Sequence, residues 1–549
     1  MATGLLGIAL TGLNAAQAGI STAQHNIANI NTPGFRRQEV DYAALNPQFN
    51  GTTFFGSGVG VSTVRSLYSQ FQDSQVLLNQ AQLSHNESYA TQASQIDQLV
   101  GNANSGLTSA MDAFFGAIQT VAADPTSNAA RQVMLSSGRN LASRINTLDT
   151  AFKNIRDASN SEIDATVTRI NIYASQIAAT SGNIARTEAS TGQPANDLRD
   201  QRDQLVAELN KLINVTPVQQ GDGAYNLFVG SGQSLVVGSN VSTMTSIDDA
   251  TNPLFLVPAL NIAGGGTQPL DSSMLRGGKL GGLLAVREDV LLPAMDDLNR
   301  IAISISTEVN AVHQNGLELD AVTSGGEFFT PAMEQQGGAI GWLRVGESTS
   351  GTTIPAEDYN VVWDGTNFTV TRLSDGAASA PILPGSEVTI GGVAQGFSLS
   401  PNLNFVPNTG TGSWKLNFSD FSRSMRMVLT APSQIAAAGA SANSGPGDNS
   451  NALLLAGLQT SENIGTNTFA GFYAQLVART ATMASEADIN VAAYETLTSQ
   501  SRVAQQAVSG VNLDEEAANL IRFQQAYQAS AKAMQVASSL FDELIGILR

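Results

Sequence analysis

The sequence offers few residues whose types and spacing could support catalysis or metal binding. Its three histidines, His25, His85 and His313, are far apart in the chain, and none belongs to an HExxH segment or to another close set of ligands. The chain has no cysteine, which excludes a thiol nucleophile, thiolate zinc sites and a disulfide framework. We therefore expect no catalytic residue, no metal site and no cofactor, and we assign His313 to packing or capping.

A second candidate for chemistry is the acidic segment DLRDQRDQL at residues 197–205. On a helix, Asp197, Asp200 and Asp203 share one face, and Arg199 and Arg202 are interleaved with them. A pair of carboxylates can hydrolyse a glycosidic bond. Because each carboxylate here has an arginine within reach, we predict a solvated helix with local ion pairs instead.

Two glycine-rich segments resemble ligand-binding loops only weakly. Residues 277–282 are GGKLGG, but Lys279 is followed by Leu280, where a phosphate-binding loop carries Ser or Thr. We predict a turn before a helix at this point. Residues 56–60, GSGVG, are predicted to be a flexible joint between the terminal helices and a rod domain. These interpretations together predict a protein that is not an enzyme.

The length and composition indicate a protein of several domains and argue against some classes of partner. At 549 residues the chain is long enough for two to four domains. Its formal net charge of -19 argues against binding to nucleic acid or to an anionic membrane surface. The sequence has no run of about 20 apolar residues, as a membrane-spanning helix needs. Because no basic segment precedes the apolar residues near the N-terminus, we expect any export to use a route without a cleaved signal.

The first 35 residues carry no Asp, Glu, Lys or Arg, yet they have a clear helical pattern. Small residues lie beside the apolar row, so a second helix could approach closely. We expect the helix to end near Ile30, because Pro33 disfavours helical backbone in the residue before it, and Pro33-Gly34 suits a type II turn. The apolar row consists of Leu6, Leu13, Ile20 and Ile27.

The C-terminal segment carries a matching pattern over residues 513–548. Asn512 is the predicted N-cap, and Glu515 completes a capping box. We name the apolar rows at both ends of the chain the terminal seam and predict that they form a coiled coil that contacts neighbouring subunits. The C-terminal residues of the seam are Leu513, Leu520, Phe523, Tyr527, Met534, Phe541, Leu544 and Leu548. The alternative is that the two amphipathic helices pack inside one compact domain.

Specific motifs then identify a resemblance. Residues 28–35, ANINTPGF, resemble the motif shared by bacterial flagellar axial proteins, which are the rod, hook and hook-associated proteins. The motif residues are Ala28, Asn29, Asn31, Thr32, Pro33, Gly34 and Phe35. Further stretches, at 277–298, 309–329, 445–459 and 509–534, resemble the hook-associated protein 1 family in order along the chain. The resemblance thus spans nearly the whole chain.

This resemblance implies a structural subunit that polymerises at the distal end of the flagellar hook and joins hook to filament. The implied partners are further copies of the chain, the hook protein, the next hook-associated junction protein and an export chaperone at the C-terminal helix. The resemblance also implies type III export in the unfolded state and an extracellular place in the flagellum. It implies no binding to nucleic acid or to a membrane.

Periodicity between the two ends predicts a nested domain organisation. Ile163, Ile170, Ile177 and Ile184 recur every seven residues in a helix-rich region, whereas 226–237 and 359–400 have hairpin patterns. We predict a mainly α protein with an inserted β domain. Its predicted parts are a terminal coiled-coil domain (1–55 plus 505–549), a helix-rich rod domain with a β-hairpin (56–330 plus 430–504) and an outer all-β domain (331–429).

Two alternatives remain at this stage. A hook or rod subunit belongs to the same axial family, but the GDN stretch at 447–449 and the ending NLDEEAANLIRFQQAYQAS argue against it. A secreted adhesin or enzyme is the other alternative, because sugar-binding and host-binding surfaces have no fixed sequence motif. Any such activity would lie in residues 331–429.

Overall fold

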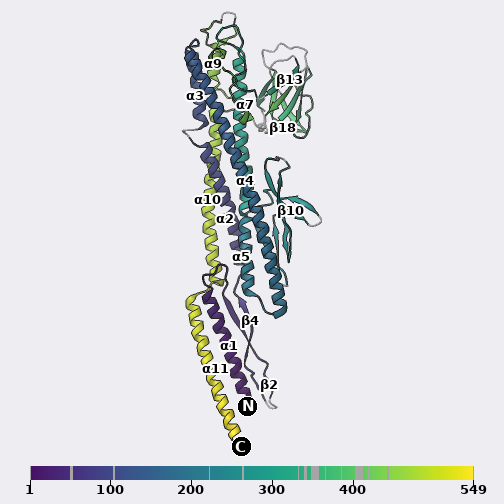
Figure 1. Ribbon diagram of the computed structural model, residues 1–549, viewed down its shortest axis with the longest axis vertical. Helices are drawn as coiled ribbons and strands as arrows, with labels where there is room; N and C mark the ends of the chain where they lie inside the picture. The colour runs from purple at the N-terminus through teal and green to yellow at the C-terminus, as the bar shows by residue number, and fades with distance from the viewer. Residues whose placement is uncertain are drawn as a thin grey trace. The chain divides into compact units, whose positions relative to one another are not determined.

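The structure is a computed structural model, and its backbone is described for residues 2–49, 53–102, 106–221, 223–250, 252–262, 265–331, 333–338, 343–347, 358–364, 366–384, 386–401, 412–417, 421–441 and 444–547. The chain forms two compact units (Figure 1). Unit 1 comprises residues 1–89, 160–285 and 488–549, and unit 2 comprises residues 90–159 and 286–487. The unit boundaries fall within helices, because α2, α4, α6 and α10 each contribute residues to both.

Long helices dominate unit 1, as the heptad patterns predict. The helix α1 joins α11 in a side-by-side pair, coloured purple and yellow in Figure 1. The helices with residues in unit 1 are α1 (Ala2–Ala28), α2 (Gln70–Val100), α4 (Asn128–Thr191), α5 (Asn196–Leu212), α6 (Gly278–Val286), α10 (Phe469–Ser509) and α11 (Leu513–Ile547).

The core of unit 1 is built on one face of α4. Ile163, Ile170, Ile177 and Ile184 have no exposed surface, which confirms the seven-residue spacing read from the sequence. The isoleucines at 163, 170 and 177 belong to one apolar cluster with residues of α5, of the neighbouring strands and of α6. The predicted turn before α6 is also confirmed, since Gly278 has φ of +71°, a conformation that favours glycine.

Unit 1 contains more β structure than the sequence patterns predicted. The predicted hairpin at 226–237 is present as β6 and β7, within a sheet of order β5-β6-β7-β8. A second sheet has the order β11-β10-β9. The strands are β5 (Val215–Gln219), β6 (Tyr225–Val229), β7 (Gln233–Val237), β8 (Asn240–Val241), β9 (Met244–Asp248), β10 (Leu256–Ile262) and β11 (Gly266–Pro269).

A β-hairpin that the sequence patterns missed follows α1. Strands β1 (Gln38–Ala44) and β4 (Val59–Ser66) pair antiparallel and pack on α1. Beyond them, β2 (Gln48–Phe49) pairs with β3 (Phe54–Phe55). We name residues 38–66 the arm and its residues Phe49, Phe54 and Phe55 the tip.

Unit 2 combines helices with the β-rich insertion. Its further helices are α3 (Leu107–Ala123), a π-helical turn (Arg287–Leu291), α7 (Leu292–Gln314), α8 (Phe421–Ser424), a 3-10 turn (Pro432–Gln434) and α9 (Ser450–Gly457). The break between α3 and α4 begins at Asp124-Pro125. A chain that is mainly helical with inserted β structure is therefore confirmed.

The insertion forms two antiparallel sheets, of order β13-β19-β15-β16 and β14-β18-β17. Both hairpins predicted for 359–400 are present, since β15 pairs with β16 and β17 with β18. Gly365 of the first predicted turn lies outside the described residues. The strands of unit 2 are β12 (Gly316–Leu317), β13 (Met333–Gly338), β14 (Leu343–Glu347), β15 (Asp358–Trp363), β16 (Phe368–Arg372), β17 (Glu387–Ile390), β18 (Val393–Pro401), β19 (Gly412–Asn417) and β20 (Ala438–Gly439).

An aromatic cluster forms the centre of the helical part of unit 2. Phe114 contacts Phe328 and Phe329 with ring centroids 5.5 and 5.6 Å apart, and Phe115 stacks on Phe469 at 6.0 Å. The buried Asn310 orders the chain beside this cluster. Its Oδ1 accepts hydrogen bonds from the backbone N–H groups of Phe328 and Phe329 at 2.8 and 2.9 Å. We name these five phenylalanines the aromatic core.

Candidate assembly interface

The contact between α1 and α11 is built from small residues on α1. Ala9, Ala16 and Ala23 are buried, and glycines 12 and 19 lie between them at the spacing of one helix face. A Cβ atom added at Gly19 would lie 2.7 Å from the Phe523 ring, so the ring of α11 rests directly on the backbone of α1. On α11 the contacting row is Glu516, Phe523, Ser530 and Ala537.

The predicted seam residues are distributed around this contact. Phe523 lies within it, whereas Leu13, Ile20, Ile27, Leu520 and Met534 are half-buried beside it. Leu6, Leu513, Tyr527 and Phe541 are exposed, with fractions of 37–51%. The side chain of Leu544 and the whole of Leu548 lie outside the described residues. One chain therefore covers part of the apolar surface of the pair and leaves the rest open.

Further large apolar side chains of the same two helices are exposed. They lie toward the N-terminal end of α1 and along α11. The helix α1 contains no Lys or Glu. Patches of this kind mark surfaces that contact other proteins. The residues are Leu5, Ile8, Leu10, Ile521, Val536 and Leu540.

The family-type motif at 28–35 forms the turn that ends α1. Thr32 Oγ1 donates a hydrogen bond to Asn29 Oδ1 at 3.1 Å, and the Phe35 N–H donates to the Thr32 carbonyl at 3.2 Å. Gly34 has φ of +81°, as the third position of a type II turn requires. Phe35 packs edge-on against His25 at 5.4 Å. Ala28 is the last residue of α1, and Asn31 and Pro33 are exposed.

This turn delivers two arginines to different partners. Arg37 binds the start of α11, because its Nε donates to Glu516 Oε1 and its Nη1 to Glu515 Oε2, both at 2.7 Å. Asn26 of α1 also donates to Glu516 Oε2 at 3.2 Å. Asn512 Oδ1 accepts the Asp514 N–H at 2.9 Å, so the predicted N-cap is confirmed. One half of the predicted capping box is present, because the Glu515 N–H donates to Asn512 Oδ1 at 3.5 Å, but the Glu515 carboxylate binds Arg37.

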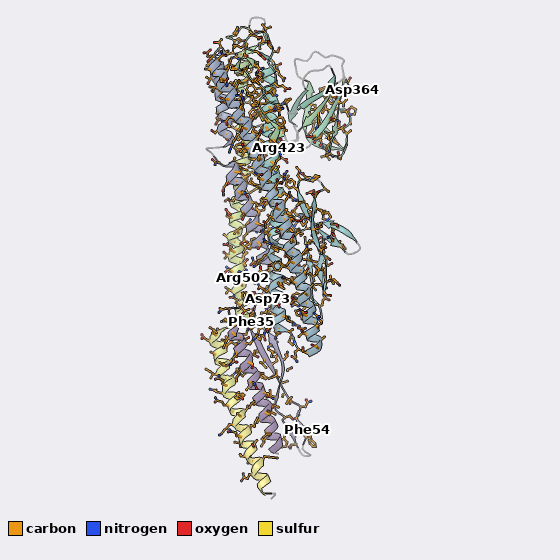
Figure 2. The ribbon with its side chains drawn as sticks, in the orientation of Figure 1. Phe35, Phe54, Asp73, Asp364, Arg423 and Arg502 are labelled. Atoms are coloured by element: carbon orange, nitrogen blue, oxygen red, sulfur yellow. The ribbon has the colours of Figure 1, made fainter. Side chains whose placement is uncertain are left out.

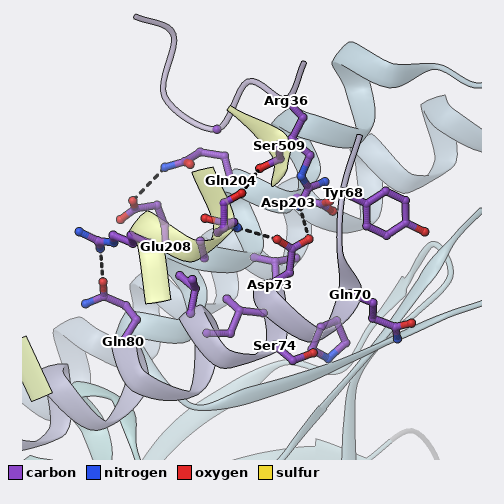
Figure 3. Close-up of a pocket in the computed structure, with 18 of the residues that line it drawn as sticks. Arg36, Tyr68, Gln70, Asp73, Ser74, Gln80, Asp203, Gln204, Glu208 and Ser509 are labelled. Carbon is purple, nitrogen blue, oxygen red and sulfur yellow. Dashed lines mark hydrogen bonds and ion pairs between the residues drawn. The ribbon is translucent and has the colours of Figure 1, made fainter. Parts of the chain in front are cut away.

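Arg36 lies at the centre of a buried cluster of charges, shown in Figure 3. Its Nη2 donates to Asp73 Oδ2 of α2 at 2.8 Å, its Nη1 binds Asp203 Oδ2 of α5, and its backbone N–H donates to Asp200 Oδ2 at 3.0 Å. Burial on its own lowers the pKa of Arg36, but the carboxylates of Asp203 and Asp73 offset it and the pKa is raised. The guanidinium therefore remains charged and fixes the turn to two helices. We name these four residues the Arg36 cluster.

The acidic segment of α5 is only partly the solvated helix that we predicted. Asp197 is exposed and Arg202 pairs locally with Asp203, but the prediction was wrong for Asp200 and Asp203, which are mostly buried. The side chain of Asp200 is 7% exposed, and its burial raises its pKa to about 6 despite the hydrogen bond from Arg36. Arg202 is buried over the ring of Tyr225, 3.3 Å from the ring centroid, and donates to the Gly223 carbonyl at 2.7 Å. The segment serves as the receptor for Arg36, which lies about 160 residues earlier in the chain.

A cavity of about 400 Å³ lies beside the Arg36 cluster (Figure 3). Its walls are polar at several points, where Arg502 binds Gln80 and Gln505 donates to Asp73 Oδ1 at 2.6 Å. Since each of these polar groups already has a partner within the chain, the arrangement joins helices α2, α5 and α10 to the turn and suits a structural role.

The histidines do not form a metal site. Among the described residues, no three His, Cys, Asp or Glu side chains come close enough to hold a metal ion. His313 is buried between the Gly326 carbonyl, 2.7 Å from Nδ1, and the Ala436 N–H, 2.9 Å from Nε2, and burial lowers its pKa to about 4. His25 contacts Asp197 at 3.2 Å.

Within the described part of the chain, no helix is long and apolar enough to cross a membrane.

Sequence reasoning missed the roles of Arg36 and Arg37. One signal was present, since these are the first two charged residues after 35 uncharged ones. Their carboxylate partners lie about 40, 160 and 480 residues further along the chain. Helical periodicity carries information over a few turns only, so it could not pair them.

Family models match four segments of the chain. Residues 93–329 match the flagellar hook-associated protein FlgK helical domain, and residues 343–396 match the flagellar hook-associated protein 1 D2-like domain. Residues 6–36 match the flagella basal body rod protein model, and residues 504–547 match the flagellar basal body rod FlgEFG protein C-terminal model. The last two segments cover most of α1 and the whole of α11.

Full-length relatives are also similar. Flagellar hook-associated protein 1 of Salmonella typhimurium is 32% identical over 566 residues, and that of Escherichia coli is 32% identical over 553 residues, with 99% of each chain covered in both cases. A solved structure, of the flagellar hook junction protein FlgK from Burkholderia pseudomallei, has a TM-score of 0.62 and 26% identity. That comparison covers 79% of this chain and 100% of the other.

Proposed function

This chain belongs to the flagellar hook-associated protein 1 family, and we propose that it is a structural subunit that polymerises at the distal end of the flagellar hook and joins hook to filament. No catalytic step is part of this role. The alternative of a hook or rod subunit is not favoured, because the relatives that cover 99% of the chain carry the hook-associated name.

The observation that carries this proposal is the incomplete burial of the α1–α11 pair. The two helices close on each other through small residues, yet Leu6, Leu513 and Phe541 remain 40–51% exposed. Neighbouring copies that place the same helices side by side would cover these side chains. The terminal seam, including Leu520 and Tyr527, is therefore the proposed contact between subunits.

The finer parts of the role rest on family membership. We propose that the chain is exported unfolded through the flagellar type III apparatus and lies outside the cell at the hook–filament junction. A cytoplasmic chaperone would cover α11 before export, because the exposed apolar residues of α11 would otherwise favour aggregation. The hook protein and the next junction protein are the proposed neighbours at either end of the short zone.

We propose that each of the three parts predicted from the sequence has its own role in the junction. The terminal part (1–55 plus 505–549) would form the joined tube, the helix-rich part (56–330 plus 430–504) would support it, and the inserted β part (331–429) would face outward. Removal of residues 335–425 with a short Gly/Ser closure should then leave joining intact.

Electron microscopy of reconstituted hooks tests the proposal. Hooks are isolated from cells that lack this chain, and the purified chain is added. We expect a short added zone at one end of each hook, followed by filament growth when the next junction protein and flagellin are supplied. Hooks that stay bare after addition of the purified chain, although junction proteins isolated from wild-type cells cap the same hooks, would contradict the proposed function.

A further inference from the structure

The tip of the arm exposes three phenylalanines that the chain itself does not cover. Phe49, Phe54 and Phe55 are 59%, 71% and 53% exposed, and the rings of Phe49 and Phe54 contact each other at 5.0 Å. Where the β1–β4 hairpin ends toward the tip, the arm contacts α1, and the Val59 N–H lies 3.4 Å from Thr11 Oγ1. Figure 2 shows Phe54 projecting away from α1 and α11.

The same unit carries an apolar groove of about 840 Å³ between α1 and α11. Leu5 and Ile8 form its wall on α1, and Ala533, Val536 and Leu540 form its wall on α11. Gly58 and Val59 of the arm line one edge of this groove, whereas the three tip phenylalanines do not, and their high exposure shows that they lie outside it. The groove is therefore open to an occupant from another molecule.

We propose that the phenylalanine tip of one copy of this chain inserts into the α1–α11 groove of a neighbouring copy. This inference rests on the proposed function, because it requires copies that are assembled side by side. Since the tip and the groove consist of different residues of one subunit, the contact between them is head-to-tail, and it can repeat from copy to copy and build a ring or helical zone.

The chemistry of the two surfaces favours a second copy as the occupant. Residues 42–64 of the arm contain no Asp, Glu, Lys or Arg, and the groove wall on α1 is equally free of charge. Lys532 is the charged residue at the groove margin, and its ammonium group can lie over an aromatic ring of the inserted tip. Burial of both surfaces together thus removes apolar area from water without leaving a carboxylate unpaired.

The size of the contact predicts when it forms. Three phenylalanines with these exposures offer on the order of 350 Å² of surface, since a buried aromatic side chain contributes ~150–250 Å². A stable interface between two free proteins buries about 800 Å² on each partner. The tip alone therefore does not dimerise free chains, and it acts in assembled junctions, where the helix pairs supply the remaining area.

Disulfide cross-linking tests the contact, because the natural chain has no cysteine. Phe54→Cys and Val536→Cys are introduced into one chain that replaces the natural protein in flagellated cells, and isolated hook–filament structures are oxidised. We expect a ladder of dimers, trimers and larger species on a denaturing gel. Phe54→Cys alone, and Phe54→Cys with Ile489→Cys on the exposed face of α10, should remain monomeric.

The outcomes separate this inference from the proposed function. Junctions that contain the double variant but give no ladder would overturn the inference, as would dimers from Phe54→Cys alone, which would indicate contact between two tips. If the cysteines prevent assembly, Phe54→Ser decides: we expect about tenfold or greater loss of incorporation with an unchanged melting temperature of the free chain. Normal incorporation of Phe54→Ser overturns the inference. Absence of the wild-type chain from junctions would instead reject the proposed function.

Discussion

The aromatic core of unit 2 and the α1–α11 pair of unit 1 treat large apolar side chains in opposite ways. Phe114, Phe328 and Phe329 have no exposed surface and contact one another, with Asn310 fully bonded beside them. In the helix pair, the buried positions are mostly alanine and glycine, whereas Leu513 and Ile521 are more than half exposed.

This difference distinguishes apolar surface that one chain buries by itself from apolar surface that it leaves exposed for neighbouring copies. The aromatic core excludes water with residues of a single copy, so it should be stable in the free chain. The helix pair has a contact of small residues that brings two backbones close, and several of its larger side chains other than Phe523 are exposed. A two-helix pair of this kind is marginally stable by itself. At one end of the pair, Arg37 binds the start of α11 and Arg36 fixes the turn after α1, and these ion pairs compensate for part of this weakness.

The largest expected effect comes from a matched pair of phenylalanines. Phe329→Ala removes a side chain with no exposed surface, so the free energy of unfolding of the free chain should fall by about 3–5 kcal/mol. Phe541→Ala removes a side chain that is 42% exposed and should change the free energy of unfolding much less. Urea unfolding of the purified chains measures both. Equal losses would show that the helix pair is as complete in the free chain as the aromatic core.

The two units should also respond to pH in opposite directions. Burial lowers the pKa of His313 in unit 2 from 6.5 to about 4, so the unfolded state binds more protons between these values, and stability falls as the pH falls through this range. Burial raises the pKa of Asp200 in unit 1 from 3.8 to about 6, so the folded state binds more protons there, and stability falls as the pH rises. Each effect spans roughly 3 kcal/mol.

Two variants isolate these contributions. The unfolding free energy of the wild type minus that of His313→Gln should increase between pH 4.5 and 6.5. The same difference for Asp200→Asn should decrease over the same range. Denaturant unfolding at several pH values measures both slopes, and slopes of the same sign would contradict the assigned causes.

A smaller effect tests the close approach of α1 and α11. Gly19→Ala places a methyl group 2.7 Å from the Phe523 ring, so overpacking should lower the stability of the pair by about 1–3 kcal/mol. Gly7→Ala on the same helix meets no atom within 4 Å and should stabilise α1 by up to about 1 kcal/mol. Protease protection of the terminal helices reports both changes. If Gly19→Ala protects α1 as well as Gly7→Ala does, the close contact is absent.

The sequence predicted the helical framework because helical periodicity is local. The seven-residue row of isoleucines located α4, the Thr32–Phe35 turn located the end of α1, and hairpin patterns located β6–β7 and β15–β16. Each of these features is set by residues within a few turns or strands of one another. The full-length resemblance then supplied the family.

Long-range contacts could not be predicted in the same way. The strands β1 and β4 are separated by the uncharged arm segment and lack a strict alternation, so they were missed. Asp200 and Asp203 looked like a solvated face, because their partner Arg36 comes from a distant turn. The row of α11 that contacts α1 depends on the packing of Phe523 against Gly19, which are about 500 residues apart in the chain.

The most direct test of the account is the joining of filament to hook by two variants of α11. Leu520 is a half-buried member of the terminal seam, whereas Gln528 is exposed. With equal export of both proteins, Leu520→Asp should abolish joining, release unpolymerised flagellin into the medium and leave the aromatic core folded. Gln528→Asp should join filaments nearly normally. Normal filaments from cells carrying Leu520→Asp would remove the terminal seam from the mechanism and contradict the account.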